Sequence, residues 1–431
     1  MMYYALVGYG VSNKALCEKL ISMGHKIFVS ELRKFTDEEK EWFSKKGIDF
    51  EEGKNSDRIC EADRIVVSPS VRFDHPALAK CRGKTFSDIE VVLDMNKPNF
   101  VIAVTGSNGK TTSCKLLSFV FQKLGLDSYA CGNIGTPAAD VLGFKTKYLV
   151  LEISSFQLFW SKMLHIDIGV VLNIQPNHLD WHPSLEHYAK SKLKLLEFSK
   201  TGIYNCSDQN IMKFISEKSN LCAFDPLKIR KVDDGIVYEG KYYTFKNDFL
   251  KTHQNLQNLS AILKIFSVMN FDLKQVLEIL EDFKPLKHRM EFVDEINGVV
   301  FLNDSKATSS AATISALENF NSRNVILLLA GRGKNEDYAD LIAQIKRKAK
   351  HVIVFGEMVE LLRDELKLSD IPYTISENMQ NAVLKAFEIS EKGDVVLLSP
   401  AGASFDMYRN YQERGEHFIN MVKLLRGKLL E

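Results

Sequence analysis

Short apolar runs with polar or glycine-containing ends alternate along this chain with longer stretches of helical periodicity. In the opening segment the pattern predicts a strand over Tyr3–Val7, a helix over Asn13–Met23, and further strands over Lys26–Ser30 and Arg64–Val67. Strands separated by a helix favour a parallel sheet covered by helices. The first segment is therefore expected to be an α/β unit.

The same alternation continues to the end of the chain. The pattern predicts these elements after residue 99: strands over Phe100–Val104, Tyr148–Ile153 and Ile168–Leu172, helices over Thr112–Lys123 and Leu185–Phe198, a hairpin over Ile236–Phe245 turning at Glu239-Gly240, and buried strands over Val299–Leu302, Asn324–Leu329, His351–Phe355 and Asp394–Leu398. The breaks at Lys97-Pro98-Asn99 and Asn297-Gly298 mark the expected domain boundaries. We expect three α/β domains in series, over residues 1–97, 98–297 and 298–431.

Composition and length fit this picture. A chain of 431 residues is too long for one core, and 45% hydrophobic with 26% charged residues is ordinary for a globular protein. A net charge of +1 does not indicate nucleic-acid binding, and no span approaches the ~18 apolar residues of a membrane helix. Met1–Gly10 lacks the features of a signal peptide. We expect a cytoplasmic protein without membrane insertion, and a monomer.

The seven cysteines are scattered, and no Cys-x-x-Cys pair occurs among them. An odd count without spacing favours free thiols in a reducing compartment. The same pattern argues against structural zinc.

A glycine-rich turn, Thr105–Thr112, joins the predicted strand Phe100–Val104 to the predicted helix Thr112–Lys123. Strand, glycine-rich loop and helix in this order are typical of a phosphate-binding loop. Lys110 can reach terminal phosphates, and Thr111 can hold Mg²⁺. Gly106 and Gly109 are separated by two residues, where the common phosphate loop has four. The central domain is therefore expected to be P-loop ATPase-like.

A second glycine turn, Gly8-Tyr-Gly10, follows the first strand, and Glu31 ends the second strand about 20 residues further on. This arrangement is typical of a Rossmann-like dinucleotide fold, although Asn13 stands in place of the third glycine. An ordinary tight turn between strand and helix explains the pattern equally well. The first domain is expected to be Rossmann-like, with its ligand undetermined by this turn.

Polar residues at strand ends suggest a metal site in the central domain. Glu152 ends a buried strand, where a carboxylate suits Mg²⁺ but also serves as a simple cap. His178 and Asp180 cluster after another apolar strand. Lys192 lies in the basic run Lys190–Lys194, for which a solvated helix face is the default interpretation. Asn255 and Asn258 share one helix face, and capping explains only one of them.

Three polar turns also follow strands in the last third of the chain. They are Asn303–Thr308, Gly331–Lys334 and Ser399–Ser404, with His288-Arg289 preceding them. Hydroxyls, an aspartate and basic residues at such positions can bind a ribose and anionic groups. Turns at equivalent strand ends indicate one shared site in a Rossmann-like C-terminal domain.

Together these residues resemble the Mur ligase family, the ATP-dependent amide-bond synthetases of peptidoglycan precursor assembly. The similar stretches run from one end of the chain to the other: Thr105–Thr111, Gly132–Gly135, Glu152–Leu158, Asn177–Asp180, His288-Arg289, Asn303–Thr308, Ser399–Asp406 and Arg414-Gly415. Within the family, the resemblance is to the member that adds D-glutamate to UDP-N-acetylmuramoyl-L-alanine through an acyl phosphate. Two departures stand out, Gln254 where histidine is usual and Gly402 where cysteine is common.

The resemblance implies roles for individual residues. It assigns Lys110, His178 and Lys192 to catalysis, and Thr111, Glu152, His178 and Lys192 to a pair of Mg²⁺ ions (Mn²⁺ being an alternative), with a CO₂-derived carbamate on Lys192. It assigns ATP to Gly106, Ser107, Asn108, Gly109, Lys110, Thr111, Thr112, Asn255, Asn258, Arg289 and Asp304. The UDP-sugar is assigned to Gly8, Gly10, Glu31, Ser68 and Asn133, and the incoming amino acid to Lys306, Thr308, Lys334, Ser404 and Phe405. Because such a site needs groups from all three domains, movement of the third domain is expected.

Four other functions stay open at this point. A related ligase could add another amino acid, since a basic residue and hydroxyls recognise carboxylates in general. A folylpolyglutamate synthase-like enzyme would not be expected to carry the first domain. A nicotinamide-dependent oxidoreductase would explain Gly8 and Gly10 but neither the phosphate loop nor the third domain. A non-catalytic nucleotide-binding regulator would leave the metal residues Glu152 and His178 without a role.

Overall fold

The computed structural model describes residues 1–134, 136–179, 181–216, 218–284, 287–317, 320, 323–333 and 338–430. The chain divides into two compact units. The first contains Met1–Ile174, Trp181–Lys246 and Asn258–Asp282, and the second contains Gln175–Asp180, Asn247–Gln257 and Phe283–Glu431. The expected domain boundaries at 97/98 and 297/298 stay predictions.

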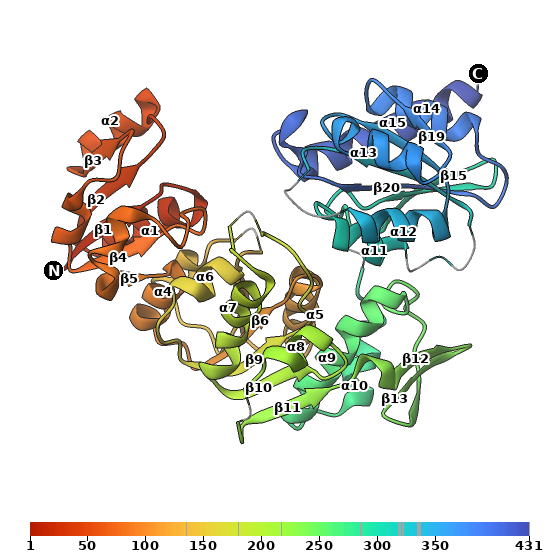
Figure 1. Ribbon diagram of the computed structural model, residues 1–431. Helices are drawn as coiled ribbons and strands as arrows, with labels where there is room; N and C mark the ends of the chain where they lie inside the picture. Colours follow the sequence, from red (N-terminus) through yellow and green to blue (C-terminus); the bar gives the residue numbers. More distant parts are fainter. Residues whose placement is uncertain are drawn as a thin grey trace. The chain divides into compact units, whose positions relative to one another are not determined.

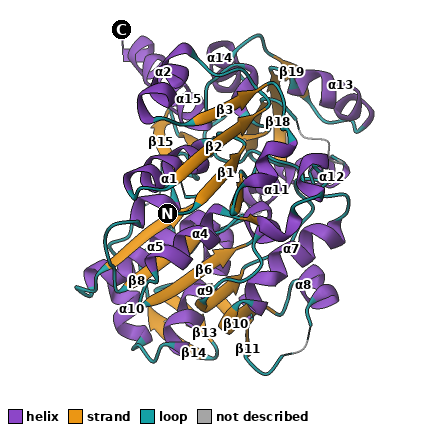
Figure 2. Ribbon diagram, turned by 90° about the vertical axis from the view of Figure 1, so that its left-hand side faces the viewer, coloured by secondary structure: helices purple, strands orange, loops and turns teal. Residues whose placement is uncertain are grey.

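The first sheet of the first unit is parallel, with the order β3-β2-β1-β4-β5. Its strands are β1 (Tyr3–Val7), β2 (Lys26–Glu31), β3 (Asp49–Glu52), β4 (Arg64–Val67) and β5 (Thr85–Phe86). Figure 2 shows β1, β2 and β3 side by side. Its helices are α1 (Val11–Ser22), α2 (Asp37–Lys46), α3 (Pro76–Ala79) and α4 (Asp88–Asn96), with the 3-10 turns η1 (Asp57–Glu61) and η2 (Arg82–Lys84). The βαβ pattern predicted for this segment is confirmed.

The second sheet of this unit is also parallel and has the order β11-β10-β9-β6-β8-β7. Its strands are β6 (Phe100–Thr105), β7 (Ser128–Gly132), β8 (Tyr148–Glu152), β9 (Ile166–Val171), β10 (Ser199–Asn205) and β11 (Leu221–Phe224). The helices that connect them are α5 (Lys110–Lys123), α6 (Ser155–Trp160), α7 (Leu185–Glu197) and α8 (Gln209–Phe214), with the 3-10 turn η3 (Ala138–Val141). The carboxyl ends of β6, β8 and β9 therefore lie next to one another, which places the loops that follow these strands at one edge.

Three short strands form a separate antiparallel sheet: β12 (Ile229–Val232), β13 (Gly235–Tyr238) and β14 (Lys241–Thr244). The predicted hairpin is β13–β14, and both turn residues, Glu239 (φ 47°) and Gly240 (φ 81°), have positive φ. Two consecutive residues with positive φ are characteristic of the type I′ turn that tight hairpins favour. The 3-10 turn η4 (Pro226–Lys228) precedes this sheet, and helices α9 (His253–Val268) and α10 (Leu273–Leu280) follow it.

The third large sheet belongs to the second unit and has the order β15-β16-β20-β17-β18-β19. Its strands are β15 (Glu291–Ile296), β16 (Val299–Asn303), β17 (Val325–Ala330), β18 (Ala349–Phe355), β19 (Tyr373–Ile375) and β20 (Val395–Ala401). Only β15 is antiparallel among the pairs described, and it joins β16 through the turn at Asn297-Gly298. The remaining elements are α11 (Ser310–Leu317), α12 (Ala339–Lys348), α13 (Met358–Leu368), the 3-10 turn η5 (Ser404–Asp406), α14 (Met379–Glu388) and α15 (Tyr411–Leu430).

Helices cover both faces of this sheet, with α11 and α12 on one side and α14 and α15 on the other (Figure 1). Strand β17 explains why, since its alternate residues enter two different cores. Leu327 and Leu329 pack with residues of α12, whereas Ile326 and Leu328 pack with residues of α14 and α15. A strand buried on both faces has no polar side, which is why Val325–Ala330 is continuously apolar. The predicted α/β class with parallel sheets is confirmed.

One expectation from the cysteines is wrong. Cys60 in η1 and Cys81 immediately before η2 form a disulfide. The other five cysteines, Cys17, Cys114, Cys131, Cys206 and Cys222, are free thiols as expected. Sequence spacing did not indicate the pair because 21 residues separate its members, and the fold brings them together. Among the described residues, no helix combines the length and the hydropathy that crossing a bilayer requires.

Candidate functional site

The phosphate loop lies where the sequence predicted it, between β6 and the first turn of α5. Gly109 is the residue before the helix, and its φ of 82° is in the left-handed region. A Cβ atom at this position would stand 2.1 Å from Oδ1 of Asn258, so a side chain here would force the Asn258 amide to move. The backbone conformation favours glycine, and the space admits a side chain only if Asn258 shifts. The same contact places Asn258 of α9 directly on the loop.

Hydrogen bonds hold the loop in one shape. The N–H of Ser107 donates to the carbonyl oxygen of Asn173 (2.9 Å), and the N–H of Asn108 donates to the Oδ1 atom of Asn173 (2.8 Å). The ammonium of Lys110 donates to the carbonyl oxygens of Gly106 (2.7 Å) and Ser107 (3.0 Å). The first N–H groups of an α-helix have no acceptor within that helix, and they add to the positive end of its dipole. An anion at the start of α5, at Lys110–Thr112, would meet these groups beside the Lys110 ammonium.

Lys192 is the most unusual ionisable residue in this part of the fold. It is 2% exposed, and its Nζ atom donates to the carbonyl oxygen of Gly106 (2.9 Å) and lies over the ring of Tyr188, 4.7 Å from the centroid. Burial holds the pKa of Lys192 well below its usual value; the charge of Lys110 acts in the same direction, and that of Glu152 opposes it. The fold thus favours a neutral amine at the phosphate loop. The default interpretation of this lysine as a solvated residue is wrong.

Glu152 ends β8 and is 2% exposed. Its Oε1 atom accepts a hydrogen bond from the Nδ2 atom of Asn133 (3.2 Å), and the N–H of Asn133 donates to the Glu152 carbonyl oxygen (2.9 Å). Its Oε2 atom is buried and has no hydrogen-bond donor among the described residues. A buried carboxylate oxygen without a donor suits a hard cation. Glu152 therefore fits the predicted role in holding Mg²⁺, and Asn133 orients it.

No group of three or more histidine, cysteine, aspartate or glutamate side chains that could enclose a metal occurs within the described parts of the chain. A Mg²⁺ site does not require such a group, because proteins usually hold this ion through one or two carboxylates together with substrate phosphates. Asp180 lies outside the described residues. Its neighbour His178 belongs to the second unit and has a φ of 56°, a strained backbone of the kind that often occurs at functional sites.

The residues predicted for a nucleotide-like ligand in the first domain lie at the carboxyl ends of β1, β2 and β4. A Cβ atom on Gly8 (φ 79°) would stand 2.7 Å from the Cβ atom of Ser68, and one on Gly10 would contact the Ser68 hydroxyl at 3.4 Å. The carboxylate of Glu31 accepts hydrogen bonds from the N–H groups of Tyr9 (2.6 Å) and Leu32 (2.7 Å). Gly8, Gly10, Glu31 and Ser68 are thus brought together.

The two asparagines of α9 have different contacts. Asn258 lies against Gly109 in the first unit, as described above. Asn255 belongs to the second unit, where its Nδ2 atom donates to the carbonyl oxygen of Phe249 (3.0 Å). Because α9 begins at His253, neither asparagine is the residue that caps the helix. Capping, the structural alternative for one of them, is therefore wrong.

In the second unit, the polar turns after β16, β17 and β20 meet at one edge of the sheet. The N–H of Arg332 donates to the carbonyl oxygen of Ala403 (2.7 Å), and the N–H of Ala403 donates to that of Arg332 (2.8 Å). Ser399 donates through Oγ to the Oδ2 atom of Asp304 (3.0 Å). The three turns are adjacent because β20 lies between β16 and β17 and is parallel to both.

Asp304 is buried at the centre of this edge. Besides Ser399, the N–H of Met290 donates to its Oδ1 atom (3.2 Å). Burial raises the pKa of Asp304 to about 7, against the opposing effects of the Ser399 hydrogen bond and the charge of Arg289. The charge of Arg289 therefore acts on the Asp304 carboxyl, and both residues are predicted to contact the nucleotide.

The residues predicted to contact the amino acid differ from one another in their exposure to solvent. The Lys306 ammonium lies over the ring of Tyr411, 4.1 Å from the centroid. Ser404 is buried, Thr308 is half-buried, and the Phe405 side chain is 67% exposed. Lys334 lies outside the described residues.

Two further residues in this region were recognised from the sequence only as parts of motifs. Arg414 is completely buried: it donates through Nη2 to the Ser305 carbonyl oxygen (2.9 Å), through Nε to the Ser305 hydroxyl (3.0 Å), and through Nη1 to the Gly402 carbonyl oxygen (3.0 Å). Burial lowers the pKa of Arg414 to about 10. The guanidinium joins the start of α15 to the turns after β16 and β20.

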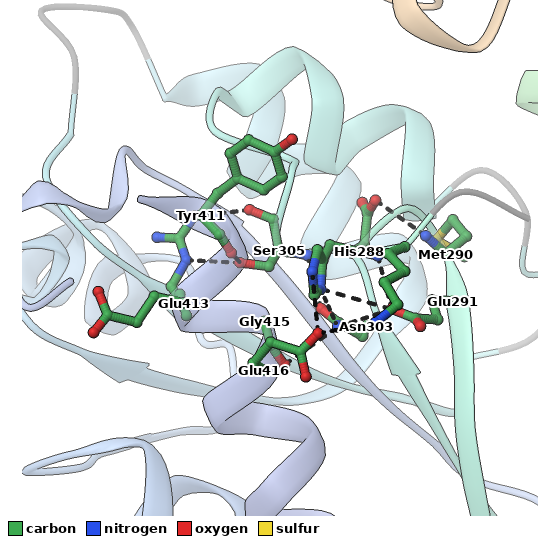
Figure 3. Close-up of polar contacts among 12 residues, drawn as sticks. His288, Met290, Glu291, Asn303, Ser305, Tyr411, Glu413, Gly415 and Glu416 are labelled. Carbon is green, nitrogen blue, oxygen red and sulfur yellow. Dashed lines mark hydrogen bonds and ion pairs between the residues drawn. The ribbon is translucent and has the colours of Figure 1, made fainter. Parts of the chain in front are cut away.

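His288 is the other such residue, and it lies between Asn303, Glu291 and Glu416 (Figure 3). Asn303 contacts the Nδ1 atom of His288 through Nδ2 (2.9 Å), and a Cβ on Gly415 would stand 2.2 Å from the same atom. Burial lowers the pKa of His288. The His288-Arg289 and Arg414-Gly415 motifs are thus the two sides of one packed contact, which spacing alone could not show.

Comparison with known proteins gives similarity along the whole chain. Residues 4–76 match the family model described as the MurD N-terminal domain, residues 104–270 match that of the Mur ligase middle domain, and residues 288–402 match that of the Mur ligase, glutamate ligase domain. The UDP-N-acetylmuramoylalanine–D-glutamate ligase of Fervidobacterium nodosum is 40% identical, with 98% of this chain and 99% of that protein covered. The enzyme of the same name from Thermotoga petrophila is 39% identical, with 98% of each covered.

Solved structures are similar in fold. The UDP-N-acetylmuramate-alanine ligase MurC from Thermotoga maritima aligns with a TM-score of 0.61 at 19% identity, covering 98% of this chain and 99% of that one. A pseudomurein peptide ligase type C from Methanothermus fervidus aligns with a TM-score of 0.62 at 16% identity, covering 98% and 100%.

Proposed function

The chain belongs to the Mur ligase family, and we propose that it joins D-glutamate to the L-alanine carboxylate of UDP-N-acetylmuramoyl-L-alanine, with conversion of ATP to ADP and phosphate. The observation that carries the proposal is the extent of the similarity to the D-glutamate ligases. It covers 98% of this chain, including the first domain. The matched family models follow one another along the sequence, from the MurD N-terminal domain through the Mur ligase middle domain to the glutamate ligase domain.

The reaction has two chemical steps. The substrate carboxylate attacks the γ-phosphorus of ATP, and cleavage of the bond to the bridging oxygen releases ADP and leaves an acyl phosphate. The amine of D-glutamate then attacks the acyl carbon, loses a proton, and expels phosphate from a tetrahedral intermediate. Negative charge gathers between anionic reactants in the first step, so fixed positive groups at that point lower the barrier.

The phosphate loop supplies such groups. The Lys110 ammonium lies at the Gly106 and Ser107 carbonyls and would turn to the terminal phosphates. The first N–H groups of α5 would bind the phosphate oxygens. Asn258 on the loop and Asn255 on the same helix would contact the nucleotide, together with Arg289 and Asp304 of the second unit.

Thr111, Glu152, His178 and Lys192 would hold the Mg²⁺ ions, which neutralise phosphate charge when bound. The Glu152 Oε2 atom, buried without a donor among the described residues, supports this role. The lowered pKa of Lys192 supports a carbamate at that residue, because only a neutral amine adds to CO₂. The carbamate would replace a cation that repels metal with an anionic oxygen ligand.

The UDP-sugar and the amino acid would bind at the carboxyl ends of the strands in the first and third large sheets. The cluster of Gly8, Gly10, Glu31 and Ser68 would receive the UDP-sugar, and Asn133 would contact it beside Glu152. Lys306, Thr308, Lys334, Ser404 and Phe405 would receive the carboxylates of D-glutamate. We further propose that the enzyme acts as a monomer in the cytoplasm.

One assay tests the proposal: phosphate release from ATP in the presence of UDP-N-acetylmuramoyl-L-alanine, with D-glutamate, L-glutamate or L-alanine added in parallel. We expect release above background only when the UDP substrate and D-glutamate are both present. Release with L-alanine but not with D-glutamate would indicate a related ligase of different specificity. Release that does not depend on the UDP substrate would contradict the assignment of the first domain.

A further inference from the structure

A cavity lies on the other side of α7 from the phosphate loop. It has a volume of about 440 Å³, within the usual range for small-molecule sites. Its walls come from α7, from the segment around α8 and β11, and from Phe159 and Arg82, all in the first unit. None of the residues predicted for the ligase reaction lines it.

The geometry of α7 explains how one helix serves two sites. Residues two positions apart on an α-helix point about 200° apart, whereas residues four positions apart share a face. Lys192 accordingly points to the phosphate loop, while Lys190 and Lys194 line the cavity. The cavity and the phosphate loop are separated by the body of this helix.

The inner surface of the cavity is apolar. Leu193 and Leu196 of α7 are buried beneath it, and Phe159, Phe214 and Leu221 complete it. An apolar concavity favours a ligand with a compact hydrocarbon or aromatic body, because binding removes both surfaces from water.

Positive groups surround this apolar surface. The Arg82 guanidinium lies over the ring of Phe159, with its carbon 5.4 Å from the centroid. The Lys194 ammonium donates to the carbonyl oxygens of Leu158 (2.8 Å) and Phe159 (3.1 Å). The ammonium thereby caps the carboxyl-terminal carbonyl groups of α6 at the cavity wall. Among the lining residues that the structure describes, Arg82, Lys190, Lys194 and Lys218 are basic and Glu197 alone is acidic, so positive charge predominates there.

Arg82 is the cation best suited to contact a ligand. Lys190 pairs with Glu186 (2.6 Å), and Lys194 is held by the carbonyls of α6. Arg82 is exposed, and its contact with the Phe159 ring fixes the guanidinium at the edge of the apolar surface. The planar guanidinium matches a carboxylate with two parallel hydrogen bonds.

We propose that this cavity binds a small amphipathic carboxylate, with its apolar body against Phe159, Leu193 and Leu196 and its carboxylate at Arg82. The proposal does not depend on the ligase function, because binding is measured directly and not through activity. A negative result for this cavity would therefore not contradict the proposed ligase function, and a negative ligase assay would not contradict binding in this cavity.

The test uses 2-naphthoate as the probe and the uncharged 2-naphthalenemethanol as its matched control. Isothermal titration is carried out on the full chain with saturating ADP and Mg²⁺, so that the nucleotide site is filled. We expect saturable binding of one naphthoate per chain, and binding of the alcohol weaker by about tenfold, because the contact with Arg82 is lost. Loss of naphthoate binding on addition of ADP would place the probe in the nucleotide site and overturn the proposal.

Paired variants locate the probe. R82Q should weaken naphthoate binding by about tenfold. R58Q should leave it unchanged, because Arg58 also lies over a phenylalanine ring, that of Phe28, but outside the cavity. Ile215→Trp should abolish binding by filling the space that Ile215 lines. Thermal melting checks that each variant is folded. Equal affinity of R82Q and R58Q, or undiminished binding to the folded tryptophan variant, would overturn the proposal.

Discussion

The chemistry of Lys192 follows from its angular position on α7. Lys190 is exposed and pairs with Glu186, whereas Lys192, two residues later, is buried against Gly106 and Tyr188. The basic run Lys190–Lys194 therefore contains chemically different groups. The sequence could not distinguish them, because every second residue of the run is lysine and the hydrogen-bond acceptor of Lys192, the Gly106 carbonyl, is 86 residues away.

Lys192→Ala should reduce ligase activity by roughly 100-fold or more, because it removes the proposed carbamate and with it a metal contact. If the carbamate is the working group, added formate or acetate should restore part of the activity. The measurement is phosphate release at saturating substrates, with and without the carboxylate. The matched control is Lys190→Ala on the exposed face of α7, which should retain activity. An unaffected Lys192→Ala variant would contradict the proposed role.

Asp304 should make stability fall as the pH rises. Its pKa is about 7 in the folded chain and 3.8 ordinarily, so between these values the folded state holds a proton that the unfolded state has lost. The contribution of protonated Asp304 to the free energy of unfolding is therefore fully present below about pH 4 and is lost as the pH rises through 7. Asp304→Asn should remove this dependence and gain up to ~4 kcal/mol of unfolding free energy at pH 8 relative to the parent.

Urea unfolding of the free protein at pH 5 and pH 8 measures this effect. The parent and Asp304→Asn should differ more at pH 8 than at pH 5. Asp364→Asn, at an exposed position of α13, is the control and should show no such difference. Equal differences at both pH values would show that Asp304 does not titrate in this range.

At the scale of elements, the sequence predicted the interior strands of the three large sheets except β10, and it missed their edge strands. Strands β1 and β17 are short apolar runs with polar ends, a pattern that burial on both faces produces. The edge strands β3 (Asp49–Glu52) and β15 (Glu291–Ile296) carry several acidic residues and were not predicted. An edge strand faces solvent along one side, so its sequence need not be apolar, and its pairing depends on a neighbour distant in sequence.

The candidate site shows the same division. The phosphate loop was predictable because its signal is local: glycines, a lysine and the strand and helix that flank it. The contacts of Asn258 with Gly109 and of His288 with Gly415 were not, because each joins segments more than 100 residues apart. Spacing identifies which residues carry the chemistry, but only folding shows which of them meet.

The ends of α5 offer a comparison of two glycines. Gly109 before the helix and Gly125 after it have similar backbone conformations, with φ of 82° and 70°. A Cβ on Gly109 would collide with Asn258, whereas nothing lies within 4 Å of one on Gly125. Alanine at either site should cost about 1 kcal/mol or more for the left-handed conformation. Only Gly109→Ala should also deform the loop and weaken ADP binding, by about tenfold or more.

Titration of ADP into the two variants, together with their melting temperatures, separates the effects. We expect both variants to melt below the parent and only Gly109→Ala to lose nucleotide affinity. Equal affinity of the two variants would mean that the contact between Gly109 and Asn258 does not shape the nucleotide site.

At the scale of the whole molecule, the residues proposed for one reaction are divided between the two units. Lys110, Glu152 and Lys192 belong to the first unit, and Arg289 and Asp304 belong to the second. One ATP molecule that uses both sets must bind to both units at once. The free energy of binding would then favour a conformation in which the two units enclose the substrates.

Small-angle X-ray scattering can detect this closure. We expect the radius of gyration to decrease when a non-hydrolysable ATP analogue, Mg²⁺ and UDP-N-acetylmuramoyl-L-alanine are added together. The decrease should be smaller in Asp304→Ala, because this variant removes a contact from the second unit and leaves the phosphate loop intact. Asp364→Ala should behave like the parent. An unchanged radius of gyration in the parent, with binding verified by titration, would contradict the expected closure.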